Sequence, residues 1–324
     1  MDDVLGLIKM QASIEKFYKQ PKVLLNSKPQ IKSPRFGEKV LNHQENAFSK
    51  EQDLPLPLGH FVTLNSGLRL HYLEEGEGPV VIWLHGSGPG ASGFSNFKGN
   101  YPEFATAGYR NIVLDLPGFG RSDKPDNVNY DLNFFVEALN GLIESLGLSQ
   151  VTLLGNSLGG AIALGQALEY PNTVERLILM APGGVEERET YFKMEGIQRM
   201  VEVYSRGPMG VEEMREVMSL QLFDAVTLSD DILAERSAVA VTQPANLFST
   251  MMVPNMTERL SELNCPVLGF WGTNDRFNPH EGMQKFLDNV PTARFIMLNR
   301  CGHWVQVEHQ RLFNTSCLDF LQHD

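Results

Sequence analysis

One serine in a glycine-rich turn could act as a nucleophile. Ser157 lies in the pattern G-x-S-x-G, after a run of apolar, β-prone residues and before small residues that open a helical stretch. In such a turn the serine takes a strained backbone conformation, and flanking glycines avoid collisions with the neighbouring strand and helix. The hydroxyl then faces a cleft at a helix N-terminus, which favours negative charge. The pattern predicts a nucleophilic serine, with an ordinary strand-to-helix turn as the alternative.

A serine hydroxyl needs a base and a third group that orients the base. Asp275 and His303 each follow a strand-like run, at residues 266–271 and 294–298. The carboxyl ends of parallel strands share one edge of a sheet, so both side chains should converge on Ser157. The chain order Ser157, Asp275, His303 is that of α/β-hydrolases. We therefore expect a catalytic triad in which His303 is the base.

The glycine-rich loop after residues 80–84 supplies the remaining catalytic part. It reads H-G-S-G-P-G from His85. Backbone N–H groups of such a loop can point at a developing oxyanion, and we expect the N–H groups of Ser87 and Leu158 to form the oxyanion hole. His85 precedes Ser157 in the chain, and we interpret it as a residue that braces the loop by hydrogen bonds.

Two other features of this region have competing interpretations. Asp115 also ends a strand-like run, and we interpret it as a structural carboxylate. A glycine pattern G-x-G-x-x-G begins at Gly88 after a strand, which formally permits a dinucleotide site. Pro89 removes one backbone donor from that loop, and a dinucleotide site leaves Ser157 and His303 unexplained. We therefore expect neither a cofactor nor a metal.

The elements that must position these residues alternate along the chain. After a hairpin pattern over residues 60–74, apolar runs typical of buried strands follow at 80–84, 111–116, 150–154, 176–181, 266–271 and 294–298. Helical stretches lie between most of them, at 94–107, 131–146, 158–169, 279–289 and 307–321. This alternation predicts an α/β fold with a mostly parallel, doubly wound sheet.

The alternation stops over residues 183–262, where the patterns are helical, at 188–205, 211–223, 229–240 and 244–252. We expect a helical lid there, inserted between the two parts of the core, residues 55–182 and 263–324. Methionines and aromatic residues of the lid could line an apolar pocket or simply pack on the core. They are Met194, Met200, Phe248, Met251 and Met252.

The first 54 residues differ from the rest. Apolar residues at spacings of three and four predict an amphipathic helix over residues 3–19: Val4, Leu7, Met10, Ile14 and Phe17. The stretch 21–57 is rich in Pro, Asn, Ser, Gln and Lys and is typical of an extended segment. We expect an N-terminal arm, residues 1–54, that packs on its own body or on a neighbouring subunit. A membrane-surface helix is the alternative.

Composition limits the partners of the chain. Its 324 residues carry a net charge of -12 at pH 7, whereas a nucleic-acid partner requires a basic surface. Its three cysteines are too few for a disulfide framework or a zinc site. No apolar run approaches the ~18 residues of a membrane span, and the N-terminus lacks the basic region of a signal peptide. We expect a cytoplasmic protein that binds a small molecule and forms a homo-oligomer, a dimer or higher.

Residues 60–324 resemble the meta-cleavage product hydrolases, α/β-hydrolases that cleave carbon–carbon bonds in ring-opened catechols. The S-G-P-G and C-G-H-W forms are much more specific to this family than a triad alone. The resemblance rests on H-G-S-G-P-G from His85, S-N-F from Ser95, D-L-P-G-F-G from Asp115, G-N-S-L-G-G from Gly155, W-G-T-N-D-R-F from Trp271 and C-G-H-W-V-Q-V-E from Cys301.

The resemblance implies cleavage of the C5–C6 bond of a 2-hydroxy-6-oxo-hexa-2,4-dienoate, giving a 2-hydroxypenta-2,4-dienoate and a carboxylic acid. Once the dienol has become a keto form, Ser157 would attack the C6 carbonyl, with His303 as base and then acid and Asp275 fixing its tautomer. Arg236 is implied as the cation for the carboxylate, with a surface arginine of the lid as the alternative. The other implied substrate contacts are Gly86, Asn96, Asn156 and Trp304.

Two other functions stay open. A carboxylesterase of the same fold needs the triad and the oxyanion hole but no arginine for a carboxylate. A ligand receptor that retains a triad would signal through its lid. The complete set of catalytic features favours turnover, so we expect a C–C hydrolase. The group at C6 also stays open, and the charged stretch V-E-E-R-E at residues 185–189 lies where the rim of its pocket is expected.

Overall fold

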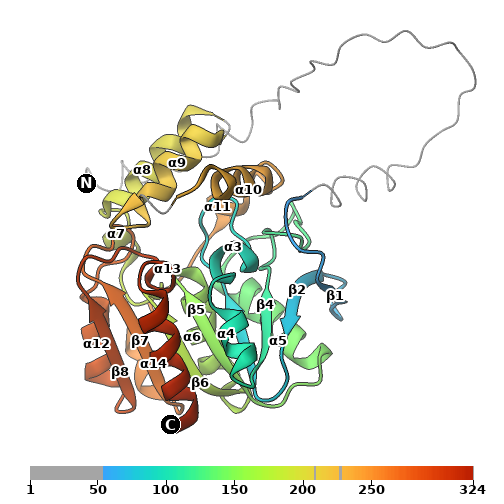
Figure 1. Cartoon of the computed structure of the whole chain (residues 1–324), viewed down its shortest axis with the longest axis vertical. Helices are drawn as coiled ribbons and strands as arrows, with labels where there is room; N and C mark the ends of the chain where they lie inside the picture. The colour runs from blue at the N-terminus through green and yellow to red at the C-terminus, as the bar shows by residue number, and fades with distance from the viewer. Residues whose placement is uncertain (1–53, 208, 226–227, 324) are drawn as a thin grey trace, which may run out of the picture.

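Eight strands form one sheet in the computed structural model, which describes residues 54–207, 209–225 and 228–323. The predicted arm lies outside the described residues up to residue 53. The strand order is β1-β2-β4-β3-β5-β6-β7-β8, and helices cover both faces (Figure 1). The strands are β1 (His60–Thr63), β2 (Arg69–Glu75), β3 (Val80–Leu84), β4 (Arg110–Leu114), β5 (Val151–Asn156), β6 (Val174–Met180), β7 (Val267–Gly272) and β8 (Ala293–Leu298).

Strand direction divides the sheet into two parts. β2 pairs antiparallel with β1 and with β4, whereas the six strands from β3 to β8 run parallel. The central strand β5 is buried along its whole length because helices pack on both of its faces, which explains its continuous apolar run. The predicted fold class, a mostly parallel doubly wound α/β sheet, is confirmed.

The core helices lie where the sequence pattern predicts them, although two predicted helices, 94–107 and 307–321, are each divided in two. The predicted helix over 94–107 is two helices, because Pro102 cannot donate within a helix interior and instead lies in the first turn of a new one. None of the described helices combines the length and the apolar character that crossing a bilayer requires. The core helices are α3 (Gly93–Phe97), α4 (Tyr101–Thr106), α5 (Leu132–Ser145), α6 (Leu158–Glu169), the 3₁₀ turn η1 (Pro171–Thr173), α12 (Gly282–Asn289), α13 (Val305–Glu308) and α14 (Gln310–His323).

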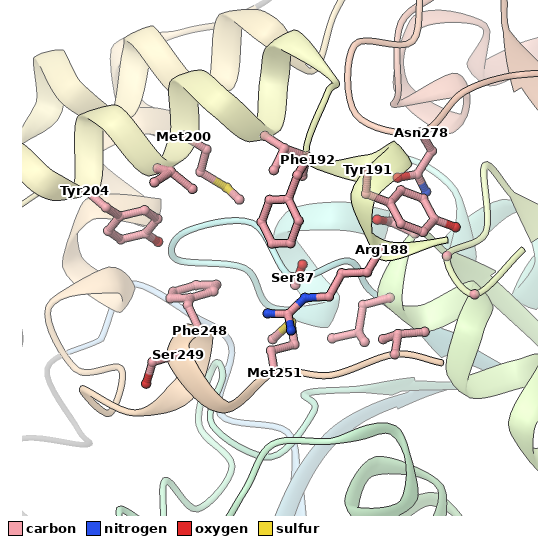
Figure 2. Close-up of a pocket in the computed structure, with 17 residues that line it drawn as sticks. Ser87, Arg188, Tyr191, Phe192, Met200, Tyr204, Phe248, Ser249, Met251 and Asn278 are labelled. Carbon is pink, nitrogen blue, oxygen red and sulfur yellow. The ribbon is translucent and has the colours of Figure 1, made fainter. Parts of the chain in front are cut away.

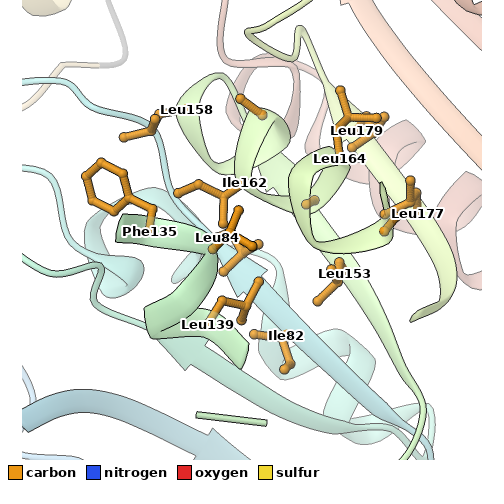
Figure 3. Close-up of a cluster of buried hydrophobic side chains, with 14 of the residues drawn as sticks. Ile82, Leu84, Phe135, Leu139, Leu153, Leu158, Ile162, Leu164, Leu177 and Leu179 are labelled. Atoms are coloured by element: carbon orange, nitrogen blue, oxygen red, sulfur yellow. The ribbon is translucent and has the colours of Figure 1, made fainter. Parts of the chain in front are cut away.

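The larger apolar cluster lies between the sheet and the helices α5 and α6 (Figure 3). Strand residues meet helix residues there in a continuous buried layer, which holds the β5–α6 unit rigidly. That unit carries Ser157 at its turn, so the packing fixes the position of the proposed nucleophile. The labelled members of the cluster are Ile82, Leu84, Phe135, Leu139, Leu153, Leu158, Ile162, Leu164, Leu177 and Leu179.

The described part of the insertion between β6 and β7 is helical, and Figure 1 shows α8, α9 and α10 beyond the carboxyl ends of the parallel strands. The helix predicted over 188–205 is divided into two. The insertion has a small core of its own, which also holds Trp304 from the loop after β8. Its elements are α7 (Arg188–Tyr191), α8 (Glu195–Arg206), α9 (Val211–Leu220), α10 (Asp230–Ala240), α11 (Leu247–Thr250) and the 3₁₀ helix η3 (Thr257–Glu262).

Candidate active site

The turn from β5 into α6 has the strain that the sequence predicts. Ser157 has φ 55° and ψ -113°, a conformation that few residues other than glycine adopt. A Cβ at Gly155 would overlap Gly159, and one at Gly159 would overlap the carbonyl of Leu84. The two glycines of the motif are therefore required by close backbone approach. The hydroxyl stands at the start of α6, at the carboxyl edge of the sheet.

Asp275 and His303 lie in the loops after β7 and β8, and the structure brings them together. Nδ1 of His303 is 2.7 Å from Oδ2 of Asp275, whose side chain is completely buried. The other carboxylate oxygen accepts the backbone N–H groups of Phe277 and Asn278, at 2.7 and 3.0 Å. With Nδ1–H directed to Asp275, Nε2 of His303 is the nitrogen that can take a proton. His303 and Ser157 line the same small cavity.

The insertion is tied to the loop that carries His303. The backbone carbonyl of Gln221, just after α9, accepts the N–H groups of His303 at 2.8 Å and Trp304 at 3.3 Å. Glu308 in α13 accepts the N–H of Phe223 at 2.7 Å. The helices above the sheet therefore help to fix the position of His303. Sequence reasoning missed Gln221, because no local motif marks a backbone carbonyl that acts across such a distance in the chain.

The two N–H groups expected to form an oxyanion hole lie beside the serine. Leu158 is the first residue of α6, so its N–H has no partner within the helix. Ser87 follows β3 in the glycine-rich loop, and both residues line a cavity together with Ser157. Ser87 and Leu158 therefore stay the predicted donors of the oxyanion hole.

His85 has the hydrogen bonds that its bracing role requires. Its Nδ1 donates to the carbonyl of Gly86 at 2.7 Å, and its Nε2 accepts the N–H of Leu116 at 3.1 Å. Burial lowers the pKa of His85 to about 4, so the ring is neutral at pH 7. A neutral imidazole with both nitrogens engaged holds the loop and is not available as a base.

Asp115 is also occupied by the fold. Its carboxylate accepts the ring Nδ1–H of His71 and the backbone N–H of Gly93, both at 2.8 Å, and the backbone N–H of Arg121 at 2.9 Å. Burial raises the pKa of Asp115, but the hydrogen bonds from His71 and Arg121 outweigh it and hold the pKa below its usual value. These contacts join the loops after β3 and β4, as a structural carboxylate should.

The glycine pattern from Gly88 serves packing against the insertion. Gly90 has φ 62°, and a Cβ there would overlap the backbone of Arg236 in α10. The backbone N–H of Gly90 donates to the side chain of Gln243 at 3.0 Å. The loop therefore lies in direct contact with the insertion where a dinucleotide site would need open space.

A small cavity of about 40 Å³ is lined by Ser157 and His303. All five residues expected to contact substrate line it, although only Arg236 comes from the insertion. Gln221 lines it as well, a contact that the sequence did not indicate. The five are Gly86, Asn96, Asn156, Arg236 and Trp304.

Arg236 is not a surface arginine, since it is only 1% exposed. Its Nε donates to the carbonyl of Pro89 at 3.1 Å, and its Nη1 donates to Ser95 Oγ at 3.1 Å and Asn96 Oδ1 at 3.3 Å. The guanidinium lies 5.1 Å from the ring centroid of Trp304. Burial lowers its pKa to about 10, so it remains a cation at pH 7. A fixed positive charge therefore faces the small cavity.

Two polar oxygens of the same lining have no hydrogen-bond partner among the described residues. They are Oδ1 of Asn156 and Oε1 of Gln221, and both are buried. The amide of Asn156 donates to the carbonyls of Met180 and His303, each at 3.3 Å. A buried polar atom without a partner is costly, so these two atoms indicate a cavity built for a polar ligand.

Comparison with known proteins agrees with this geometry. Residues 79–310 match the family described as the alpha/beta hydrolase fold. The 2-hydroxy-6-oxononadienedioate/2-hydroxy-6-oxononatrienedioate hydrolase of Comamonas testosteroni is 38% identical over 276 residues, or 81% of this chain and 95% of that protein. The 2-hydroxy-6-oxo-6-phenylhexa-2,4-dienoate hydrolase of Burkholderia cepacia is also 38% identical, with the same coverage.

A solved structure of the meta-cleavage product hydrolase from Pseudomonas fluorescens IP01 superposes with a TM-score of 0.73 at 26% identity. It covers 82% of this chain and 97% of that one. The chain belongs to the meta-cleavage product hydrolases. The family resemblance expected from the motifs is thus confirmed, and the residues of this hydrolase that surround Ser157 can be considered as parts of one enzyme site.

A second and larger cavity of about 210 Å³ is also lined by Ser157 in this hydrolase (Figure 2). Of the lid residues expected to line it, Met200, Phe248 and Met251 do so. Met194 and Met252 do not line it. The backbone of Met252 pairs with the segment before α5, and its side chain is 56% exposed.

The sequence did not single out two polar residues of the larger cavity, Arg188 and Tyr191 of the short helix α7. Burial raises the pKa of Tyr191 to about 12, so its hydroxyl is protonated at pH 7, and it accepts the N–H of Val185 at 3.2 Å. Among the described residues, no group of three or more His, Cys, Asp or Glu side chains is arranged to hold a metal ion.

Proposed function

We propose that this hydrolase cleaves the C5–C6 bond of a 2-hydroxy-6-oxo-hexa-2,4-dienoate, with Ser157 as the nucleophile. The observation that carries the proposal is the pair of cavities that meet at Ser157. The small one holds the buried cation Arg236, and the larger one is mostly apolar. A dienoate has a carboxylate at one end and the C6 group at the other, so its two ends suit the two cavities. A simple ester has no carboxylate that would need a buried cation.

The reaction begins with binding of the dienoate end in the small cavity. Arg236 takes the C1 carboxylate, and the side chains of Asn96 and Asn156 contribute hydrogen bonds beside it. The bound dienol then becomes the keto tautomer as the 2-hydroxyl loses its proton and C5 gains one. This step turns C5–C6 into a bond between a methylene and a ketone, which can be broken by attack at C6.

Carbon–carbon cleavage follows from nucleophilic attack. Ser157 Oγ adds to the C6 carbonyl while Nε2 of His303 takes its proton, and the N–H groups of Ser87 and Leu158 hold the oxyanion. Collapse of this intermediate breaks C5–C6, and the electron pair moves through the C2–C5 system onto the C2 oxygen. His303 returns its proton there, which gives 2-hydroxypenta-2,4-dienoate and an acyl group on Ser157.

Water completes the cycle. It adds to the acyl carbonyl with His303 as the base, and the second collapse releases the carboxylic acid and restores the Ser157 hydroxyl. Asp275 keeps Nδ1 of His303 protonated and its ring in place during both halves. The arrangement needs one water per turnover, and both protons that move during acyl transfer pass through the same imidazole.

The test is to mix the purified protein with a 6-phenyl or 6-alkyl dienoate and follow the loss of its colour. The proposal predicts rapid bleaching and formation of the two acids. Brisk hydrolysis of a p-nitrophenyl ester without any bleaching would identify a carboxylesterase instead. Binding of the dienoate without turnover of either compound would favour a ligand receptor.

The proposal also includes the setting of the enzyme. We place it in the cytoplasm as a homo-oligomer, with residues 183–262 acting as the lid of a core formed by residues 55–182 and 263–324. Its cysteines are free and buried, which suits a reducing compartment: Cys265, Cys301 and Cys317. Light scattering of the purified full chain tests the assembly, and a monomeric mass would contradict it.

A further inference from the structure

Arg188 is an exposed, charged side chain that lines the larger cavity (Figure 2). It lies at the start of α7, and its guanidinium points into the space among Phe192, Ser87 and Met251. Among the described residues that line this cavity, it is the one charged side chain. The guanidinium lies 5.2 Å from the ring centroid of Phe192. A cation at this place is unexpected in a cavity that would only receive an apolar group.

No carboxylate of the described residues lies within ion-pair distance of Arg188. Its sequence neighbours Glu187 and Glu189 are exposed and do not line the cavity. Glu186, two residues earlier, forms an ion pair with Lys285 at 2.8 Å. The acidic stretch around Arg188 therefore does not neutralise it, and the guanidinium is available to an anionic group of a ligand.

The cavity is large enough for an apolar chain that ends in a polar group. An apolar cavity of about 150 Å³ holds a benzene molecule, and this one has about 210 Å³. Phe192, Met200 and Phe248 supply apolar walls. Figure 2 places the hydroxyls of Tyr204 and Ser249 on the side toward which the Arg188 guanidinium points. A ligand tail could therefore lie on apolar side chains and end among donors.

We propose that Arg188 binds a second anionic group of the substrate, a carboxylate at the far end of the C6 substituent. The preferred substrates are then dienoates with a carboxylate at both ends. Arg236 takes the first carboxylate in the small cavity, and Arg188 takes the second in the larger one, with Ser157 between them. This inference rests on the proposed function, because it assigns one end of the same substrate.

The experiment compares two substrates that differ in one charge. The wild-type enzyme is assayed with 2-hydroxy-6-oxonona-2,4-dienedioate and with the same compound that has a carboxamide at C9. The rates of bleaching give kcat and KM for each substrate. We expect kcat/KM to be about tenfold higher for the diacid, mainly through KM, because the contact is remote from the reacting bond. The preference should shrink at high salt, since Arg188 is exposed.

Variants of Arg188 and of a nearby lysine test whether the preference for the diacid depends on Arg188. Arg188→Gln should lose about tenfold in kcat/KM on the diacid and less than about twofold on the carboxamide. Arg188→Lys should recover part of the loss, because a cation alone supplies part of the attraction. Lys193→Gln is the matched control, since Lys193 is an exposed cation of the same segment outside the cavity, and it should leave both substrates unaffected.

Three results would overturn the inference: equal wild-type kcat/KM on the two substrates, equal losses on both in Arg188→Gln, or the same loss in Lys193→Gln. Each leaves the proposed function intact as long as the dienoates are bleached. If neither is bleached, the proposed function fails, and the diacid is titrated calorimetrically into Ser157→Ala with and without Arg188→Gln. A dissociation constant weakened about tenfold supports the role of Arg188, and an unchanged one contradicts it.

Discussion

Two arginines of the helical insertion approach Ser157 from different cavities, and the protein holds them in opposite ways. Arg236 is almost fully buried, donates to Pro89, Ser95 and Asn96, and lies over Trp304. Arg188 is exposed, and its one described contact with another ring or ion is the face of Phe192.

The difference separates a fixed subsite from an adjustable one. A guanidinium whose donors are already oriented by the protein binds one group at one place, at little further entropic cost. That suits the dienoate end, which the chemistry requires in every substrate. A guanidinium on a short helix at an open cavity can follow ligands of different length. That suits the C6 end, which can vary without changing the reaction.

The largest effect is expected from removal of the nucleophile, which should abolish turnover while substrate binding in both cavities is retained. Ser157→Ala should lower kcat on a 6-phenyl dienoate by about 10⁴-fold or more, because no other described group is placed as the nucleophile. The dienoate should still bind with a dissociation constant within about threefold of its KM, since neither cavity depends on the hydroxyl. Spectral titration and bleaching measure the two quantities. A fall of less than about 100-fold in the rate of bleaching would show that another group acts as the nucleophile.

The buried arginine should matter for one substrate class only. Arg236→Gln is expected to lower kcat/KM on the dienoate by about 100- to 1000-fold, because a fixed charge contact with the carboxylate is lost. Hydrolysis of neutral p-nitrophenyl acetate should change by less than about threefold. Arg188→Gln, the same substitution in the same insertion, is the control and should have a smaller effect on the 6-phenyl dienoate. Equal losses on ester and dienoate would remove the special role of Arg236.

The buried His85, which braces the glycine-rich loop, should make the stability of the fold depend on pH. The unfolded chain protonates His85 near pH 6.5, whereas the buried ring resists protonation until about pH 4. Stability is therefore full above pH 6.5 and falls by about 3 kcal/mol as the pH drops to about 4. Urea unfolding at pH 7, 5.5 and 4.5 should show a shallower decline in His85→Asn. An identical decline in both proteins would mean that burial does not lower the pKa of His85.

The smallest effect concerns Gln221, which connects the insertion to His303 through its backbone. Gln221→Leu keeps that carbonyl but removes the buried side-chain oxygen that has no partner among the described residues. We expect the free energy of unfolding to rise by about 1 kcal/mol and kcat/KM on the dienoate to fall by about three- to tenfold. Urea unfolding and bleaching measure the two. Destabilisation by more than about 1 kcal/mol would show that the side chain is structural.

The core part of the site could be predicted because each residue lies in a local motif at the end of a strand. Ser157, Asp275 and His303 follow β5, β7 and β8, and a parallel sheet brings those ends to one edge. Glycines next to the nucleophile and the histidine mark the sharp turns. Asn156 and Trp304 are neighbours of triad residues in the chain, and the family resemblance implied them as substrate contacts.

The insertion could be predicted only in part. Its helical character follows from the periodicity, but the break between α7 and α8, which turns Arg188 and Tyr191 toward the cavity, has no strong local signal. Arg236 was named through family resemblance alone, since its neighbours in space come from a loop about 140 residues earlier in the chain. Such positions depend on how helices pack on the core, which a single sequence does not specify.

The most direct test of the account is a rapid-quench experiment with a 6-phenyl dienoate. The reaction is stopped during the first turnover, and the digested protein is examined by mass spectrometry. We expect a benzoyl group on the peptide that holds Ser157, present once 2-hydroxypenta-2,4-dienoate has formed and before benzoate is released. Simultaneous release of both products, with no benzoyl group on the protein at any time, would contradict Ser157 as the nucleophile that cleaves the bond.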